Sequence, residues 1–292
     1  MTDPIDARPA EVPAADPGPT DSRHAPGYDF GGATFDLESP QDREIVRFIL
    51  SQALYGEATG VYCGKSLYAA RSLEAAQFYV RQAAQELRHL EVFGSIFREL
   101  DMRPSRAHWV IRFLSTHNNY YPVKVMMEHL IGEGLVLDLF RDVLMQTLPD
   151  SDPRVPPIKR KLEAICRDEE KHVAWGERET RRLARGSALL RTAYFGILEL
   201  QLALLPVLVK AVASRGEGHP VLGQTGAFLD SVRERLYAKG REVGFVPVRR
   251  PPGRAHRAGA IAVGAGLLVR SRFARSRSKL EKSYIRELGL DS

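Results

Sequence analysis

Two short stretches carry the residue types of a metal site at a spacing that suits a helix. Both read Glu-x-x-His: one is Glu86-Leu-Arg-His89 and the other is Glu169-Glu-Lys-His172. Residues three apart in an α-helix lie on the same face, one turn from each other. Carboxylate oxygens and imidazole nitrogens together bind transition metals. One such motif is common by chance, whereas two within long helical stretches indicate a metal site.

A single glutamate precedes each motif on an otherwise apolar helical stretch: Glu57 before the first and Glu133 before the second. Converging buried carboxylates cost several kcal/mol each unless positive charge compensates them, and metal ions supply that charge. The series Glu, Glu-x-x-His, Glu, Glu-x-x-His is the ligand pattern of a dinuclear site in a four-helix bundle. Solvated Glu and His on amphipathic helices would explain one motif, but not the ordered set. The predicted ligands are Glu57, Glu86, His89, Glu133, Glu169 and His172.

The third carboxylate has an alternative in Glu128. It lies five residues before Glu133, which in an α-helix puts it nearly on the opposite side. Glu133 is preferred because its face is more apolar and because Gly132 and Gly134 leave room beside it.

Further residues are predicted around the metals. A metal-bound histidine usually donates its second ring N–H to a carboxylate, and Asp168 is expected to reach His89 across the bundle in this role. A lone buried histidine such as His129 is most often an ordinary core residue, but it also faces the expected site. The predicted substrate pocket consists of Tyr79, Phe93, Met126, His129 and Phe140.

The periodicity that carries these residues predicts an all-α fold, a four-helix bundle with additional C-terminal helices. Ser39-Pro40-Gln41-Asp42 has the sequence of a helix start, with Ser as N-cap and Pro in the first turn. Core helices are predicted over about 40–64, 72–101, 121–148 and 156–185, and further helices over 187–214 and 223–240.

Composition divides the 292 residues into a disordered arm over 1–38, a helical bundle domain over 39–245 and a basic tail over 246–292 with short helical segments. The arm holds six prolines up to Pro26 and few large apolar residues, a composition that does not bury a core. Nine of the 42 basic residues lie between Arg249 and Lys279, where there is no acidic residue, so the rest of the chain has 33 basic and 36 acidic residues. The net charge of +6 therefore belongs to the tail.

The tail allows several interpretations. Its apolar run Ala258–Val269 is too short to span a bilayer. Arginines flank the run, so segment 249–279 would contact a membrane surface, pack on the bundle, bind tRNA phosphates or remain solvated.

Cysteine content and targeting signals bear on location. Cys63 and Cys166 are too few for a disulfide scaffold, and no basic start leads into an apolar secretory segment. A cytoplasmic location is expected, peripheral to a membrane if the tail binds one. The apolar stretch 187–214 is expected to be a buried helix rather than a transmembrane one because it contains Glu199, Gln201, Pro206 and Lys210.

On these motifs the chain resembles the ferritin-like di-iron carboxylate proteins, which include the ribonucleotide reductase small subunit and O2-activating oxygenases and oxidases. Asp168-Glu-Glu-Lys-His172-Val-Ala-Trp-Gly176 is similar to their second ligand helix, and the resemblance covers residues 40 to about 180. It implies two Fe ions, with Mn/Fe as the alternative, held by the six residues above and supported by Asp168. It also implies O2 as co-substrate and an external electron donor of the ferredoxin or flavin reductase type.

Two positions narrow this resemblance. Phe93 stands where the radical-generating subunits have a tyrosine, and Ile165 stands where the arylamine N-oxygenases have an extra histidine. The expected function is therefore that of a monooxygenase or oxidase acting on a small organic or lipid-like substrate, by hydroxylation, N-oxygenation or aldehyde or C–C oxidation. The alternatives are iron storage without an organic substrate and tRNA hydroxylation. A homodimer is expected from base rates.

Overall fold

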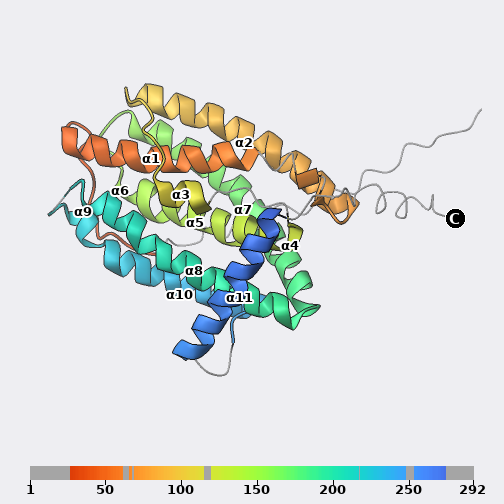
Figure 1. Ribbon diagram of the computed structural model, residues 1–292. Helices are drawn as coiled ribbons and strands as arrows, with labels where there is room; N and C mark the ends of the chain where they lie inside the picture. The colour runs from red at the N-terminus through yellow and green to blue at the C-terminus, as the bar shows by residue number, and fades with distance from the viewer. Residues whose placement is uncertain are drawn as a thin grey trace, which may run out of the picture.

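The structure is a computed structural model that describes residues 27–61, 66–67, 69–114, 120–216, 218–247 and 253–273. Within these ranges the chain is helical and contains no strand, which confirms the all-α class. In chain order (Figure 1) the elements are α1 (Pro40–Gly60), α2 (Leu73–Glu99), α3 (Trp109–Leu114), α4 (Tyr121–Lys124), η2 (Val125–Gly132), α5 (Glu133–Asp138), η3 (Leu139–Leu144), α6 (Met145–Thr147), α7 (Val155–Arg185), α8 (Ala188–Ala213), α9 (Pro220–Gly223), α10 (Thr225–Val243) and α11 (Arg254–Phe273).

Four long helical stretches surround the predicted site: α1, α2, α7 and the stretch 121–147. Helix α1 packs along α2, α2 contacts α7, and α7 packs on η2 and α5 (Figure 1). Each stretch contributes apolar side chains to one shared core cluster, among them Ile45, Phe93, Phe140 and Leu162. The helices thus pack through apolar stripes, and the few polar residues within those stripes are brought to the centre.

Serine caps begin two of these helices as the sequence predicts. The Ser39 hydroxyl accepts from the backbone N–H of Asp42 at 3.5 Å, and the Ser72 hydroxyl accepts from the backbone N–H of Ala75 at 3.1 Å. Such caps stabilise a helix by about 1 kcal/mol because they satisfy backbone donors that the first turn leaves free.

The stretch 121–147 differs from the regular helix that its pattern predicts. It alternates between α and π segments, α4-η2-α5-η3-α6. At the end of η2, the backbone N–H of Glu133 donates to the carbonyl of Glu128, five residues earlier. Residues five apart lie nearly above one another in a π-turn, so Glu128 lies one turn from Glu133 and not on the opposite side. The expectation that Glu128 lies on the opposite side of the helix from Glu133 assumed α-helical geometry, and it is wrong because this segment is a π-helix.

The folded region begins earlier than predicted. Phe30, Phe35 and Leu37, within the predicted arm, are each at most 2 % exposed. Side chains of η3 and α6 hold this segment: the backbone N–H of Gly27 donates to Asp142 at 2.9 Å, and Gln146 donates to the Tyr28 carbonyl at 2.6 Å. The predicted arm over 1–38 is therefore too long, because the prolines before residue 27 masked a short apolar segment. Residues 1–26 lie outside the described residues.

Helices α8, α10 and α11 form a second layer over the stretch 121–147 (Figure 1). Among the described residues, α8 alone is long and apolar enough to cross a membrane, a property that core helices of soluble proteins share. Helix α11 crosses α8 where two glycines meet: a Cβ on Gly196 would lie 1.8 Å from the Ala260 carbonyl oxygen, and one on Gly264 would lie 2.9 Å from that of Ala193. The described part of the tail forms one 20-residue helix rather than the predicted short segments, and it packs on α8, which was one of the interpretations of the tail.

Candidate metal centre

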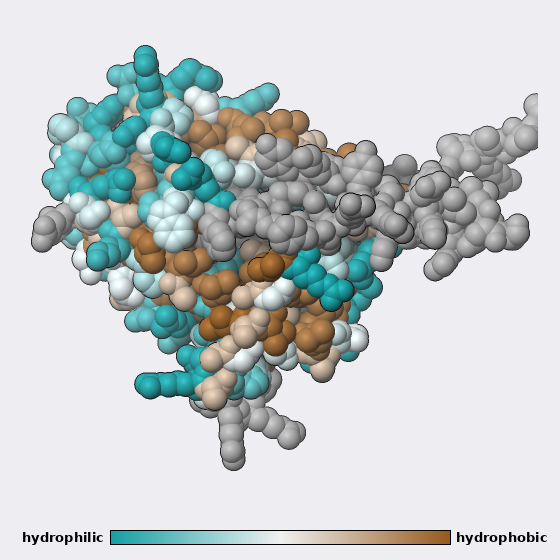
Figure 2. Space-filling view, in the orientation of Figure 1, coloured by the Kyte–Doolittle hydropathy of each residue, from teal (hydrophilic) through white to brown (hydrophobic). Residues whose placement is uncertain are grey.

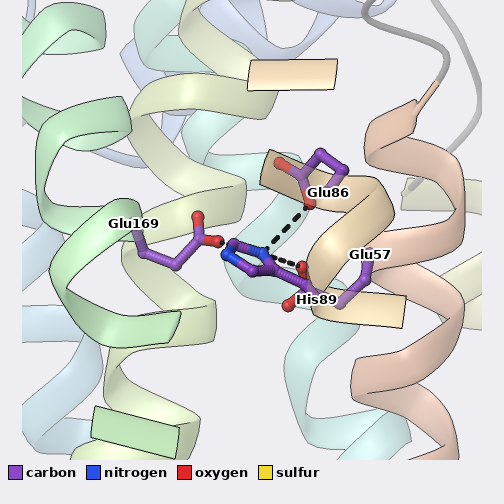
Figure 3. A group of neighbouring side chains, drawn as sticks. All are labelled: Glu57, Glu86, His89 and Glu169. Atoms are coloured by element: carbon purple, nitrogen blue, oxygen red, sulfur yellow. Dashed lines mark hydrogen bonds and ion pairs between the residues drawn. The ribbon is translucent and has the colours of Figure 1, made fainter. Parts of the chain in front are cut away.

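The six predicted ligands converge from four helical stretches. Glu57 comes from α1, Glu86 and His89 from α2, Glu133 from the start of α5, and Glu169 and His172 from α7. All six are buried, with Glu133 the most exposed at 9 %. Figure 3 shows Glu57, Glu86 and Glu169 pointing toward His89 from three different helices.

The ligand atoms form two groups, each able to hold a metal ion. One group is Glu57, Glu86, His89 and Glu169, and the other is Glu86, Glu133, Glu169 and His172. Within each group the atoms lie within 4.8 Å of one another. Glu86 and Glu169 belong to both groups, so the geometry suits two adjacent ions that share two carboxylates.

In the first half of the centre, the ring of His89 is surrounded by carboxylates. Its Nδ1 lies 2.8 Å from Glu57 Oε2, 3.2 Å from Glu169 Oε1 and 3.6 Å from Glu86 Oε2. Its Nε2 lies 3.6 Å from Asp168 Oδ2. The structure therefore places Asp168 behind His89, where the sequence predicted it.

In the second half, His172 is oriented in the same way. Its Nδ1 lies 3.0 Å from Glu169 Oε2, 3.7 Å from Glu86 Oε1 and 4.0 Å from Glu133 Oε1. Its Nε2 lies 3.0 Å from Gln85 Oε1. Sequence reasoning missed Gln85, although its position one turn before His89 on α2 was a signal that it borders the site.

An amide links the carboxylates of two helices. The side chain of Gln82 is fully buried and donates through Nε2 to Glu133 Oε1 at 2.9 Å and to Glu86 Oε1 at 3.3 Å. Gln82 precedes Glu86 by four residues, so both lie on the same face of α2. Glycine at position 60 makes room for Glu86, because a Cβ there would lie 2.6 Å from the carboxyl carbon.

Burial dominates the electrostatics of the centre. It raises the pKa of Glu57, Glu86 and Glu133, and the charge of Glu169 adds to the rise. Burial would also raise the pKa of Glu169, but hydrogen bonds from His172 and His89 hold it well below its usual value. Burial lowers the pKa of His89, but bonds to Glu169 and Glu57 outweigh this and raise it to about 12.

A bound cation would provide a partner for a buried carboxylate oxygen that has none among the described residues. Glu57 Oε1 is buried and has no hydrogen-bond partner in the described part of the chain. Because an unpaired buried carboxylate oxygen is costly, the donor set fits metal ions better than it fits an ordinary polar core.

The residues predicted to form a substrate pocket are packed in the core. Tyr79, Phe93, Met126, His129 and Phe140 are all fully buried, and none of them lines the cavity that borders Glu57, Glu86 and Glu133. His129 lies between the rings of Phe78, Tyr79 and Trp175, and burial lowers its pKa to about 3. The helical periodicity correctly indicated that these residues are buried, but it could not indicate which helix faces border the cavity.

The cavity next to the centre is lined by other residues. It has a volume of about 280 Å³ and is bordered by Glu57, Glu86 and Glu133 at the centre. Lys124 and Glu128 also line it and form an ion pair, in which Lys124 is buried and Glu128 is partly exposed. Glu128 belongs to neither metal group, and it is held by Lys124.

No family model matches the sequence, and no curated protein matches it.

Proposed function

We propose that the protein is a dinuclear metal oxygenase or oxidase that uses O2 to oxidise an organic substrate. One observation carries the proposal: two buried ligand groups from four helices share Glu86 and Glu169. This matches the ligand plan of ferritin-like four-helix bundles, which place one Glu on each of two helices and Glu-x-x-His on the other two. Mixed carboxylate and imidazole ligands favour iron, and a manganese–iron pair uses the same donors.

Each residue has a defined part in this proposal. Glu86 and Glu169 would help to hold both ions, together with Glu57 and His89 for one ion and with Glu133 and His172 for the other. When bound, the metal pair supplies the redox chemistry of O2 activation, with two electrons from an external ferredoxin or flavin reductase type of donor. The protein's own contributions are positioning, through Asp168, Gln85 and Gln82, and exclusion of water by burial.

The neighbouring cavity favours substrate oxidation over iron storage. Its walls are mainly apolar, with side chains such as Val136, Leu205 and Val209. An entry route for iron would need hydrated polar groups, whereas an organic substrate is bound by apolar walls with a few polar groups. Hydroxylation of tRNA stays a prediction, because the side chains of Arg272, Arg275 and Arg277 lie outside the described residues.

The test is metal content per chain after anaerobic loading with Fe(II), followed by O2 uptake. We expect about two ions per chain and uptake of O2 on mixing, both lost in Glu86→Ala. Glu163→Ala is the matched control, because Glu163 is an exposed glutamate on α7. Wild-type protein without stoichiometric metal would contradict the proposal. Continued oxidation of Fe(II) far beyond two ions per chain would indicate storage.

A further inference from the structure

The cavity beside the metal centre is elongated along the helices. Its lining on α1 extends from Ile49 to Gly60 and its lining on α8 from Gln201 to Val212. At ~1.5 Å per residue each wall is about 16 Å long. The cavity is thus a channel between α1 and the stretch 121–147 on one side and α8 and α10 on the other.

The two ends of this channel differ. Glu57, Glu86 and Glu133 lie at one end. At the other end Ile49 and Val143 belong to a hydrophobic cluster that also contains Phe30 and Phe35, and Val212 packs against it. An occupant therefore meets the metal ligands at one end and hydrocarbon side chains at the other.

Most polar side chains along the channel already have partners. Gln52 donates to the Phe48 carbonyl and accepts from the His108 N–H, while the hydroxyls of Thr59 and Thr225 donate to backbone carbonyls. Lys124 pairs with Glu128, and Asp138 with Arg235 at 3.1 Å. Away from the metal ligands, these groups leave little hydrogen-bonding capacity for a polar occupant.

Gln201 is the exception. It is 5 % exposed, and its Oε1 has no hydrogen-bond partner in the described part of the chain. Helix α8 leads from Tyr194, whose hydroxyl donates to the Pro122 carbonyl at 2.9 Å, to Val212, which packs on the cluster that contains Val143. Gln201 therefore lies at the end of the channel away from Val212, which is the carboxylate end. A buried acceptor without a donor costs about 1–3 kcal/mol, so a ligand that donates there would be favoured.

Helix α8 is strongly apolar, but other parts of the described chain bury only a minor part of it. Only 39 % of its most apolar stretch is buried, and four channel-lining residues of α8 remain partly exposed: Leu205, Leu208, Val209 and Val212. Figure 2 shows apolar side chains reaching the surface where α8 and α11 cross. An apolar occupant of the channel would cover the inner face of α8.

We infer that the channel binds an extended aliphatic chain, with its polar, oxidisable end at the carboxylates beside Gln201 and its tail toward Ile49 and Val212. This inference rests on the proposed function for the identity of the oxidised end. The predicted substrate class was small organic or lipid-like, and the channel selects an unbranched chain with one hydrogen-bond donor near its head.

The test is binding of primary alcohols of increasing length, measured by displacement of a fluorescent apolar probe without O2. We expect the dissociation constant to fall about fourfold per added methylene from hexan-1-ol upward, and to level off once the channel is full. Val209→Trp, which fills the channel, should abolish the dependence on length. Val207→Trp is the matched control, because Val207 is 40 % exposed on the same helix and does not line the cavity.

A second variant keeps the test decisive if Val209→Trp does not fold. Val136→Trp narrows the opposite wall and should have the same effect, with the folded state of each variant checked by thermal unfolding. Equal binding of all alcohols by wild type, or equal loss in Val207→Trp and Val209→Trp, would overturn the inference.

Gln201 has a separate readout. Gln201→Leu should reduce the preference for dodecan-1-ol over its methyl ether about fivefold, the effect of one neutral hydrogen bond, while keeping the dependence on chain length. An unchanged preference would overturn the assignment of the head group to Gln201.

Metal content of the same samples separates the two proposals. Stoichiometric metal without length-dependent binding overturns the aliphatic ligand and leaves the oxygenase proposal. Length-dependent binding by protein that retains no metal after anaerobic loading supports the ligand class and overturns the proposed function.

Discussion

The two halves of the candidate metal centre share Glu86 and Glu169 but differ in what lies behind each histidine. Behind His89 is Asp168, and behind His172 is Gln85. Partial burial raises the pKa of Asp168, but Lys171 and His89 hold it below its usual value, so this residue is a carboxylate. Gln85 offers a neutral amide oxygen. One histidine is thus polarised by a charge and the other by a dipole.

The backbones of the two halves also differ. Glu57 belongs to the regular helix α1, whereas Glu133 stands at the junction between η2 and α5 and is held by Gln82. A carboxylate behind a histidine raises its basicity as a ligand. The half that contains His89 should therefore bind its ion more tightly, and the half that contains His172 should exchange its ion more readily.

Removal of a shared carboxylate should have the largest effect. Glu169 contacts both histidines, at 3.2 Å from His89 and 3.0 Å from His172. We expect Glu169→Ala to lose both ions, because Glu169 belongs to both ligand groups and its negative charge would be lost from each. Elemental analysis after anaerobic loading measures this. Retention of one ion would mean that Glu169 serves only one half.

Removal of one histidine should affect one half only. We expect His89→Ala and His172→Ala each to retain about one ion per chain, because the remaining group keeps its own histidine and three carboxylates. Titration with Fe(II) under anaerobic conditions gives the stoichiometry of each variant. If either variant loses both ions, the two halves bind cooperatively and the comparison between them fails.

The regular helices explain what the sequence could predict. The pairs Glu86–His89 and Glu169–His172 lie on α2 and α7, where a spacing of three fixes a common face whatever the tertiary packing. The start of α1 follows equally from Ser39 and Pro40. These features are local, so periodicity and capping rules are enough to find them.

Features set by packing between helices could not be predicted. The π segments shift the hydrogen bonds of 121–147 by one residue, and no side-chain pattern marks where this occurs. The channel depends on how α8 and α10 lie over α1, so the predicted pocket was placed on faces that are closed by Phe93 and Phe140. Gln85 was missed because an amide next to a motif glutamate has no distinct spacing of its own.

Neutralising the charge behind His89 should have a moderate effect. We expect Asp168→Asn to weaken metal binding in that half about 10–100-fold, the usual result of losing such a partner, and to leave the other half nearly unchanged. Competition with a chromophoric chelator measures the two affinities. Lys171→Met is the control, because it removes the exposed partner of Asp168 without touching His89. If Lys171→Met weakened metal binding as much as Asp168→Asn does, the proposed role of Asp168 would be refuted.

The smallest expected effect comes from making the residue behind His172 resemble the one behind His89. Gln85→Glu would place a carboxylate behind His172 and make the second half resemble the first, since Gln85 Oε1 already lies 3.0 Å from Nε2. We expect its ion to bind several-fold more tightly, because the added charge makes the imidazole a stronger donor to the metal, so that the two affinities approach each other. Gln85→Leu should move the weaker affinity the other way, since His172 then loses its only hydrogen bond on that side among the described residues. If both variants weaken binding equally, the amide acts through its shape, and the difference between Asp168 and Gln85 does not set the order in which the ions bind.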